Sequence, residues 1–358
     1  MRTNMTRVAF AAVLVLVIVM TGEVTARIED YIRRGVPVLF TPDRTADLVL
    51  HDDLGIRGRP NGRYARWQLN GAGFRGPEFA KRVAAGCRRV MILGASESFG
   101  LYESENMDYP AQLSTRLRGG GRCYEVLNAS LFGLTLPGIT RMWESWANQF
   151  GPQTVVVYPT PSFYLAERPP APPGQPPARS EGPPWWTPRL LGRARDMVEF
   201  PAFIQRRRVS RDAAALESAH DAAWFFNELP LDRVEQFERD LGTLVSAIQA
   251  AGASPVLVTH ANGFHRPPRA AQLDALESWR MLLRKPRASV LLEFEDAARQ
   301  ATLAVAQQRG VDAIDAAGIM NGHDQWFAED LLHFNDQGAA KLAELLAEHL
   351  TGQTIRQP

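Results

Sequence analysis

The chain has 358 residues, of which 45% are hydrophobic and 22% charged, and its formal net charge is +1. This is the composition of a globular protein with one large domain or two small ones. The near-neutral charge offers no general attraction to nucleic acid or to acidic lipid, so nucleic acid is not expected as a partner.

The first apolar segment follows two arginines. Arg2 and Arg7 precede residues 8–20, a run without any charge. A positive region followed by such a run is typical of an export signal, although a full membrane span needs about 20 residues. Residues 6–24 therefore predict a signal anchor, and the small residues at 24–26 leave a cleaved signal peptide as the alternative. A buried core helix is the third interpretation. Either form of export places the rest of the chain outside the cytoplasm, in the periplasm or at the cell surface.

Residues 27–86 carry few periodic signals and are expected to form a juxtamembrane arm that packs against the main domain. From residue 87 onward, short apolar runs alternate with amphipathic segments. The alternation predicts a doubly wound, flavodoxin-like α/β domain of three layers over 87–352, with about five parallel strands. The strands are expected at 90–93, 124–127, 154–158, 255–259 and 313–314, and the helices at 107–118, 137–149, 232–251, within 272–309 and at 337–350.

One segment interrupts this alternation after the third strand. Nine prolines lie between residues 169 and 188, and no helix runs through such a stretch. Residues 162–230 are therefore expected to form an insertion. It is either a disordered surface loop or a lid over the substrate, with Trp185 and Trp186 at its tip.

The only two cysteines, Cys87 and Cys123, stand at the starts of the first and second strands. In a sheet ordered 2-1-3-4-5 these strands are parallel neighbours, so their starting ends lie side by side. That separation suits a disulfide, which we predict between the two residues. Two buried free thiols are the alternative.

Chemistry in an open α/β sheet collects at the carboxyl ends of the strands. The first strand ends in Gly94-Ala95-Ser96, and a serine in such a turn can point its hydroxyl into the crevice. Its own backbone N–H is then free to bind an oxyanion. The signal is weak alone, because similar turns bind phosphate or simply need small residues.

Two further turns supply complementary groups. Asp330 precedes His333 by three residues, between the last strand and the last helix, so a carboxylate can orient an imidazole that takes the serine proton. Gly133 follows the second strand, where its backbone N–H could approach a reacting carbonyl. Three weak signals in this order, each after its own strand, reinforce one another.

These motifs over residues 88–350 resemble the SGNH (GDSL-like) hydrolase superfamily. Residues 70–76 are similar to a segment that precedes the catalytic domain in its membrane-anchored bacterial members. Gly94-Ala95-Ser96 is similar to its first block, Gly133 to its second, and Asp330 with His333 to its last. The resemblance implies Ser96 as nucleophile, His333 as base and Asp330 as the residue that orients it. It also implies backbone oxyanion donors at Ser96 and Gly133.

The sequence departs from the family pattern at the third block, which normally provides an asparagine as a third oxyanion donor. Here the third strand runs into Tyr158-Pro159-Thr160-Pro161-Ser162. Thr160 and Ser162 are the candidates to replace the missing amide. Losing one such donor typically costs a factor of about 10²–10³ in rate.

The favoured function is an extracytoplasmic serine esterase that removes an O-acetyl or short acyl group from a glycan or a small ester. An acyltransferase that uses the same triad on a cell-surface polysaccharide is the second hypothesis, and a non-catalytic glycan-binding or assembly protein is the third. No cofactor is expected, and the histidines lack the paired spacing of a metal site. His260 and His265 follow the fourth strand and could reach substrate, or be ordinary loop residues.

Overall fold

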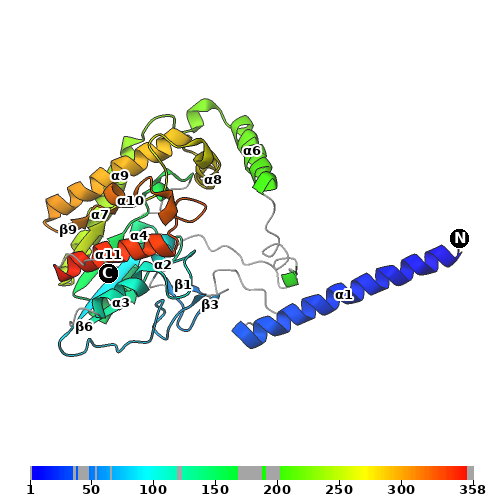
Figure 1. Cartoon of the computed structure of the whole chain (residues 1–358), viewed down its shortest axis with the longest axis horizontal. Coiled ribbons are helices and arrows are strands. Elements are labelled where there is room, and N and C mark those ends of the chain that lie inside the picture. Colours follow the sequence, from blue (N-terminus) through cyan, green and yellow to red (C-terminus); the bar gives the residue numbers. More distant parts are fainter. Residues whose placement is uncertain are drawn as a thin grey trace.

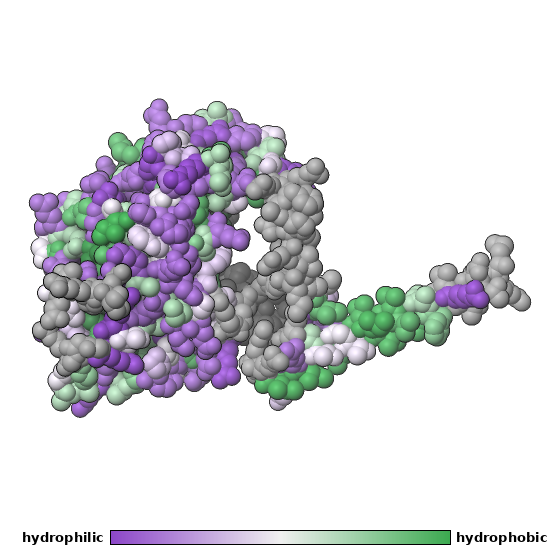
Figure 2. Space-filling model, in the orientation of Figure 1, coloured by the Kyte–Doolittle hydropathy of each residue, from purple (hydrophilic) through white to green (hydrophobic). Residues whose placement is uncertain are grey.

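A computed structural model describes residues 2–34, 38, 48–52, 55–64, 67–118, 123–167, 188–190 and 202–352. Its first element, α1 (Arg2–Arg34), is one continuous helix that projects away from the rest of the molecule (Figure 1). The helix therefore continues to Arg34, into the residues from 27 onward that were expected to begin the juxtamembrane arm. The stretch Phe10–Glu29 is long and apolar enough to cross a membrane, and its apolar side chains are exposed along the projecting helix (Figure 2).

The body of the molecule is built on a five-stranded parallel sheet. Its strand order, β6-β5-β7-β8-β9, is the predicted 2-1-3-4-5 order, and every neighbouring pair is parallel. The predicted doubly wound α/β class is thereby confirmed. The strands are β5 (Cys87–Gly94), β6 (Cys123–Asn128), β7 (Thr154–Tyr158), β8 (Ser254–Val258) and β9 (Asp312–Ile314).

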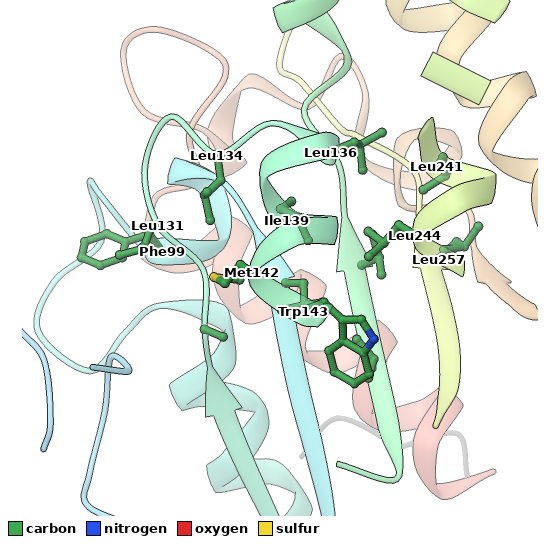
Figure 3. Packing of buried hydrophobic residues seen from close by; sticks show 14 of the residues in the cluster. Phe99, Leu131, Leu134, Leu136, Ile139, Met142, Trp143, Leu241, Leu244 and Leu257 are labelled. Carbon is green, nitrogen blue, oxygen red and sulfur yellow. The ribbon is translucent and has the colours of Figure 1, made fainter. Parts of the chain in front are cut away.

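Successive side chains of a strand point to opposite faces of the sheet, so alternate residues of each strand belong to two different apolar clusters. Met91 and Leu93 face a cluster with α4 (Leu136–Ser145), α7 (Leu231–Ala250) and α9 (Ala288–Arg309). Figure 3 shows this face, with side chains of α4 and α7 packed beside the sheet. Val90 and Ile92 face the second cluster, with α3 (Tyr109–Arg118) and α11 (Asp336–Thr351). Burial on both faces explains why the strands read as continuous apolar runs.

The helical stretch expected within 272–309 contains two helices, α8 (Leu273–Leu283) and α9. The chain turns between them at Arg284, whose φ is +70°, and Pro286 follows in a position that a continuous helix does not accept. The remaining short helices are η1 (Ala147–Phe150), η3 (Ala222–Trp224), η4 (Ala270–Gln272), α10 (Ala316–Met320) and η5 (Asp324–Trp326).

The region expected to be an arm forms two small hairpins and then packs on the main domain. The hairpins pair β1 (Val49–Asp52) with β2 (Gly55–Gly58) and β3 (Arg63–Tyr64) with β4 (Trp67–Gln68). Phe74 stacks on Trp146 at 4.7 Å between ring centroids. The Arg75 guanidinium donates to the carbonyls of Phe99 and Gly100, both at 2.6 Å. The arm thus holds the end of α2 (Ser96–Phe99), the helix that begins with the candidate nucleophile.

The described parts of the expected insertion are η2 (Pro161–Leu165), residues 188–190 and α6 (Ala202–Ala219). Trp185, Trp186 and most of the proline-rich stretch lie outside the described residues. The backbone N–H groups of Arg189 and Leu190 donate to the Glu23 carboxylate of α1, at 3.0 and 2.8 Å. The insertion therefore contacts the N-terminal helix through these two hydrogen bonds.

The two cysteines stand opposite each other in the register of β5 and β6. They form a disulfide, with 4.4 Å between their Cα atoms. The bond joins the first residues of two neighbouring strands. It therefore lies at the amino ends of the strands, and the candidate site lies at their carboxyl ends.

Candidate active site

The candidate nucleophile lies in the tight turn between β5 and α2. Gly94 approaches its neighbours closely: a Cβ there would lie 2.2 Å from Ser98 Oγ and 2.9 Å from the Tyr158 carbonyl oxygen. Only glycine fits without a shift of the backbone. Gly100 then ends α2 with φ +81°. The turn places Ser96 at the carboxyl end of the sheet, where the sequence predicted it.

A line of two hydrogen bonds joins Ser96 to the turn before α11. His333 Nε2 lies 2.9 Å from Ser96 Oγ, and His333 Nδ1 lies 2.6 Å from Asp330 Oδ2. The second Asp330 oxygen accepts the backbone N–H groups of Leu332 and His333, both at 3.0 Å. The aspartate is therefore held by its own turn while it orients the imidazole. The structure brings together the three residues that the sequence singled out.

The charges around His333 favour its protonated form. Burial alone lowers the pKa of His333, but the Asp330 hydrogen bond and the charges of Glu97, Asp330 and Glu103 outweigh it and raise the pKa above its usual value. Burial raises the pKa of Asp330, but its bonds to His333 and to the turn outweigh that and lower it. The pair is therefore suited to hold a proton on the imidazole during a reaction.

The Gly133 loop lies against the end of β5. The N–H of Leu131 donates to the Gly94 carbonyl at 3.4 Å, and the N–H of Ala129 donates to the Ile92 carbonyl at 3.1 Å. Gly133 has φ +75°, which favours glycine, while a Cβ there would meet no atom within 4 Å. This backbone angle favours glycine, and the approach of the Gly133 N–H to a reacting carbonyl stays a prediction.

Neither of the two candidates for the third oxyanion donor, Thr160 and Ser162, has a hydroxyl seen to point at the place of an oxyanion. The Thr160 hydroxyl donates to Glu97 Oε2 at 3.0 Å, so its single proton is directed at a carboxylate. This arrangement removes Thr160 as a donor to an oxyanion as long as that bond persists. Ser162 is buried in η2, and its role stays a prediction.

Sequence reasoning missed two buried residues beside the site, Glu97 and Glu295, and the burial of a third, His260. Glu97 follows the nucleophile directly, and His260 was considered only as a loop residue that could reach substrate. Instead His260 is 4% exposed and lies between the two carboxylates. The available signal was an acidic residue directly after the serine of the turn. Two of its partners, Thr160 and His260, follow β7 and β8, far away in the sequence.

No metal centre is formed by the part of the chain that the structure describes, because it contains no group of three or more His, Cys, Asp or Glu residues placed to hold an ion. A cavity of about 640 Å³ lies between the arm and α3, and no triad residue lines it. Two of the amides that line it, those of Asn70 and Asn128, bond backbone groups of their own loops and of α2.

No family model matches this chain, and no curated protein matches it. Solved structures with a similar arrangement include TesA, with 15% identity, 74% of this chain and 99% of that chain covered, and a TM-score of 0.45. The lipase/acylhydrolase from Enterococcus faecalis has 15% identity, coverage of 75% and 100%, and a TM-score of 0.44. The native M. smegmatis aryl esterase has 13% identity, coverage of 74% and 99%, and a TM-score of 0.44. The likeness concerns the arrangement of elements, so the activity of this chain rests on its own residues.

Proposed function

We propose that this protein is a serine esterase of the SGNH type, in which Ser96, His333 and Asp330 cleave an acyl ester. One observation carries the proposal: the unbroken hydrogen-bonded line from Asp330 through His333 to Ser96. It stands at the carboxyl ends of parallel strands, where α/β enzymes hold their substrates.

The proposed reaction follows from the order in which Asp330, His333 and Ser96 contact one another. His333 Nε2 takes the proton of Ser96 Oγ as that oxygen attacks the acyl carbonyl, while Nδ1–H donates to Asp330. The developing oxyanion is proposed to be bound by the backbone N–H groups of Ser96 and Gly133. His333 then gives its proton to the departing alcohol oxygen, which leaves an acyl group on Ser96. Water, activated by the same imidazole, releases the acid.

The proposed substrate is an O-acetyl or short acyl ester, carried by a glycan or a small molecule. The ring of Tyr102 lies over His333, at 4.8 Å between centroids, and is half exposed. It offers an alcohol or sugar a flat aromatic face beside the imidazole. Transfer of the acyl group to a sugar hydroxyl is the competing outcome, since the acyl-enzyme is common to both reactions.

A fluorophosphonate probe tests the proposal, because it reacts with an activated serine. We expect a stoichiometric adduct that peptide mass spectrometry places on Ser96. Turnover of p-nitrophenyl acetate is then measured with and without an oligosaccharide. Free acetate as the main product in both conditions supports the esterase, and acetylated oligosaccharide supports the transferase. No adduct on Ser96 rejects both and favours a binding protein.

We also propose that the catalytic domain lies outside the cytoplasm, anchored in the cytoplasmic membrane by α1. The apolar stretch of α1 is preceded by Arg2 and Arg7, and positive charges tend to remain on the cytoplasmic side. The Cys87–Cys123 disulfide suits an oxidising compartment.

Thiol labelling of the full chain in a bacterial host tests this location. After lysis in denaturant, a maleimide reagent should add nothing to the chain, and two adducts should form once a reductant is supplied. Two adducts without reductant would mean that the domain folded in the reducing cytoplasm, and would reject the location.

A further inference from the structure

A buried carboxylate lies directly beside the candidate nucleophile. Glu97 is 4% exposed, and its Oε2 accepts the Thr160 hydroxyl at 3.0 Å and lies 3.4 Å from Ser96 Oγ. Its other oxygen lies 3.4 Å from His260 Nε2. A single side chain thus contacts the nucleophile, the residue in the position of the missing amide donor, and a second histidine.

His260 is held from its other side by a second carboxylate. Its Nδ1 lies 2.6 Å from Oε2 of Glu295, a residue of α9 that is 3% exposed. Each ring nitrogen of His260 thus faces a carboxylate oxygen, an arrangement that favours the doubly protonated imidazolium. Both carboxylates are almost fully buried.

The electrostatics agree with this geometry. Burial alone lowers the pKa of His260, but the charges and hydrogen bonds of Glu295 and Glu97 raise it to about 10. Burial raises the pKa of Glu97, but the bond and charge of His260 and the charge of His333 lower it to about 2. Glu97 is therefore ionised wherever an esterase would operate.

We infer that Glu97, held by His260 and Glu295, is a positioning residue that provides His333 with a second counter-charge besides Asp330 and directs the Ser96 and Thr160 hydroxyls. This role rests on the proposed function of Ser96 and His333. It adds to that function a charge carried by the residue next to the nucleophile.

The proton of Ser96 connects the two effects of Glu97, on the direction of the Ser96 hydroxyl and on the charge of His333. When His333 is neutral, its Nε2 is the closer acceptor at 2.9 Å, and Glu97 at 3.4 Å is the weaker one. When the proton passes from Ser96 to His333, an imidazolium forms between Asp330 and Glu97. The Glu97 charge favours that state and receives no proton itself, so the proton stays on His333 until the leaving oxygen takes it.

Other ionisable groups face the same residues. Tyr109 and Tyr158 lie near Glu97, and burial raises the pKa of both above the usual value, so they stay neutral. Tyr102 and Glu103 lie near His333. Burial raises the pKa of Glu103 to about 8. Its titration therefore overlaps the pH range over which the titration of His333 is followed.

Glu97→Gln removes the charge and keeps an oxygen for Thr160, while His260 retains Glu295. We expect the His333 pKa to fall by about one unit, as for the loss of an opposite charge within a few ångströms. It is measured by NMR of the full chain in micelles, with ¹³C-labelled histidine. The acid limb of kcat/KM for p-nitrophenyl acetate should move to lower pH together with it. The plateau should fall about tenfold, since the transition state contains the imidazolium.

Three further variants make the test selective. Glu97→Gln is repeated in a Glu103→Gln background, which removes the overlapping titration. Glu344→Gln, at a carboxylate paired with Lys341 on α11, is the matched control and should change neither quantity. Glu97→Asp keeps the charge, so His333 should titrate closer to wild type than in Glu97→Gln. An aspartate variant whose His333 pKa falls as far as in the glutamine variant overturns the inference.

The NMR titration separates this inference from the proposed function. An unchanged His333 pKa in Glu97→Gln overturns the counter-charge, even in an active esterase. A lowered pKa in a protein whose ester turnover does not depend on Ser96 supports the counter-charge and rejects the proposed function instead.

Discussion

Replacing Ser96 with alanine is expected to lower kcat/KM for p-nitrophenyl acetate by about 10⁴-fold or more and to abolish fluorophosphonate labelling. The hydroxyl is the group proposed to attack, and no other hydroxyl is bonded to His333 among the described residues. The residue begins α2 and is only partly buried, so the fold should persist, which circular dichroism and the melting temperature check.

Ser98→Ala is the matched control, two residues along the same helix. The Ser98 hydroxyl accepts a hydrogen bond from Tyr109 at 2.7 Å inside the second apolar cluster, away from His333. This variant should still be labelled by the probe. Turnover that survives in Ser96→Ala would show that another group does the chemistry, and the proposed function would have to be abandoned.

Replacing Asp330 with asparagine is expected to reduce kcat by about 10⁴-fold while the protein stays folded. Asparagine cannot stabilise the imidazolium and favours the wrong tautomer of His333. The single oxygen of asparagine can still accept the backbone N–H groups of Leu332 and His333, as Oδ1 of Asp330 does, so the turn should persist. Asp324→Asn, at an exposed aspartate shortly before the triad turn, is the control and should retain wild-type kinetics.

The same variant has a defined effect on pH dependence. His333 must be neutral to accept the serine proton, so kcat/KM rises with pH as His333 loses its proton. Because the pKa of His333 is raised above its usual 6.5, the wild-type enzyme should reach half of its maximal kcat/KM above pH 6.5. In Asp330→Asn the residual activity should have its acid limb at lower pH, since one of the charges that raise this pKa is gone. An acid limb at unchanged pH would mean that another group controls it.

The strands and the three triad residues were accessible from the sequence for a physical reason. Strands buried on both faces must be apolar throughout, so β5 and β7 stand out as short runs. Ser96 follows such a run in a turn that excludes larger residues at Gly94. Asp330 and His333 belong to one turn, so their spacing of three residues already describes a local contact.

Other features have no local signature. The expected long stretch within 272–309 has a break at Arg284 that depends on a backbone angle. His260 resembled an ordinary loop residue, because nothing near it in the sequence shows that Glu295 of α9 lies 2.6 Å away. The positive φ of Gly133 is likewise a backbone angle that no local pattern showed.

The sequence by itself determined the nature of the sheet, its strand order, and the three residues that meet at its carboxyl edge. Burial patterns and tight turns are local, and parallel strands bring their ends to one edge. Only the tertiary structure decided the electrostatic surroundings of Ser96. Thr160, His260 and Glu295 come from three separate elements, and the charge that Glu97 carries depends on their distances and on the exclusion of water. Ser96 thus lies between His333, which the sequence singled out, and Glu97, whose contacts only the tertiary structure shows.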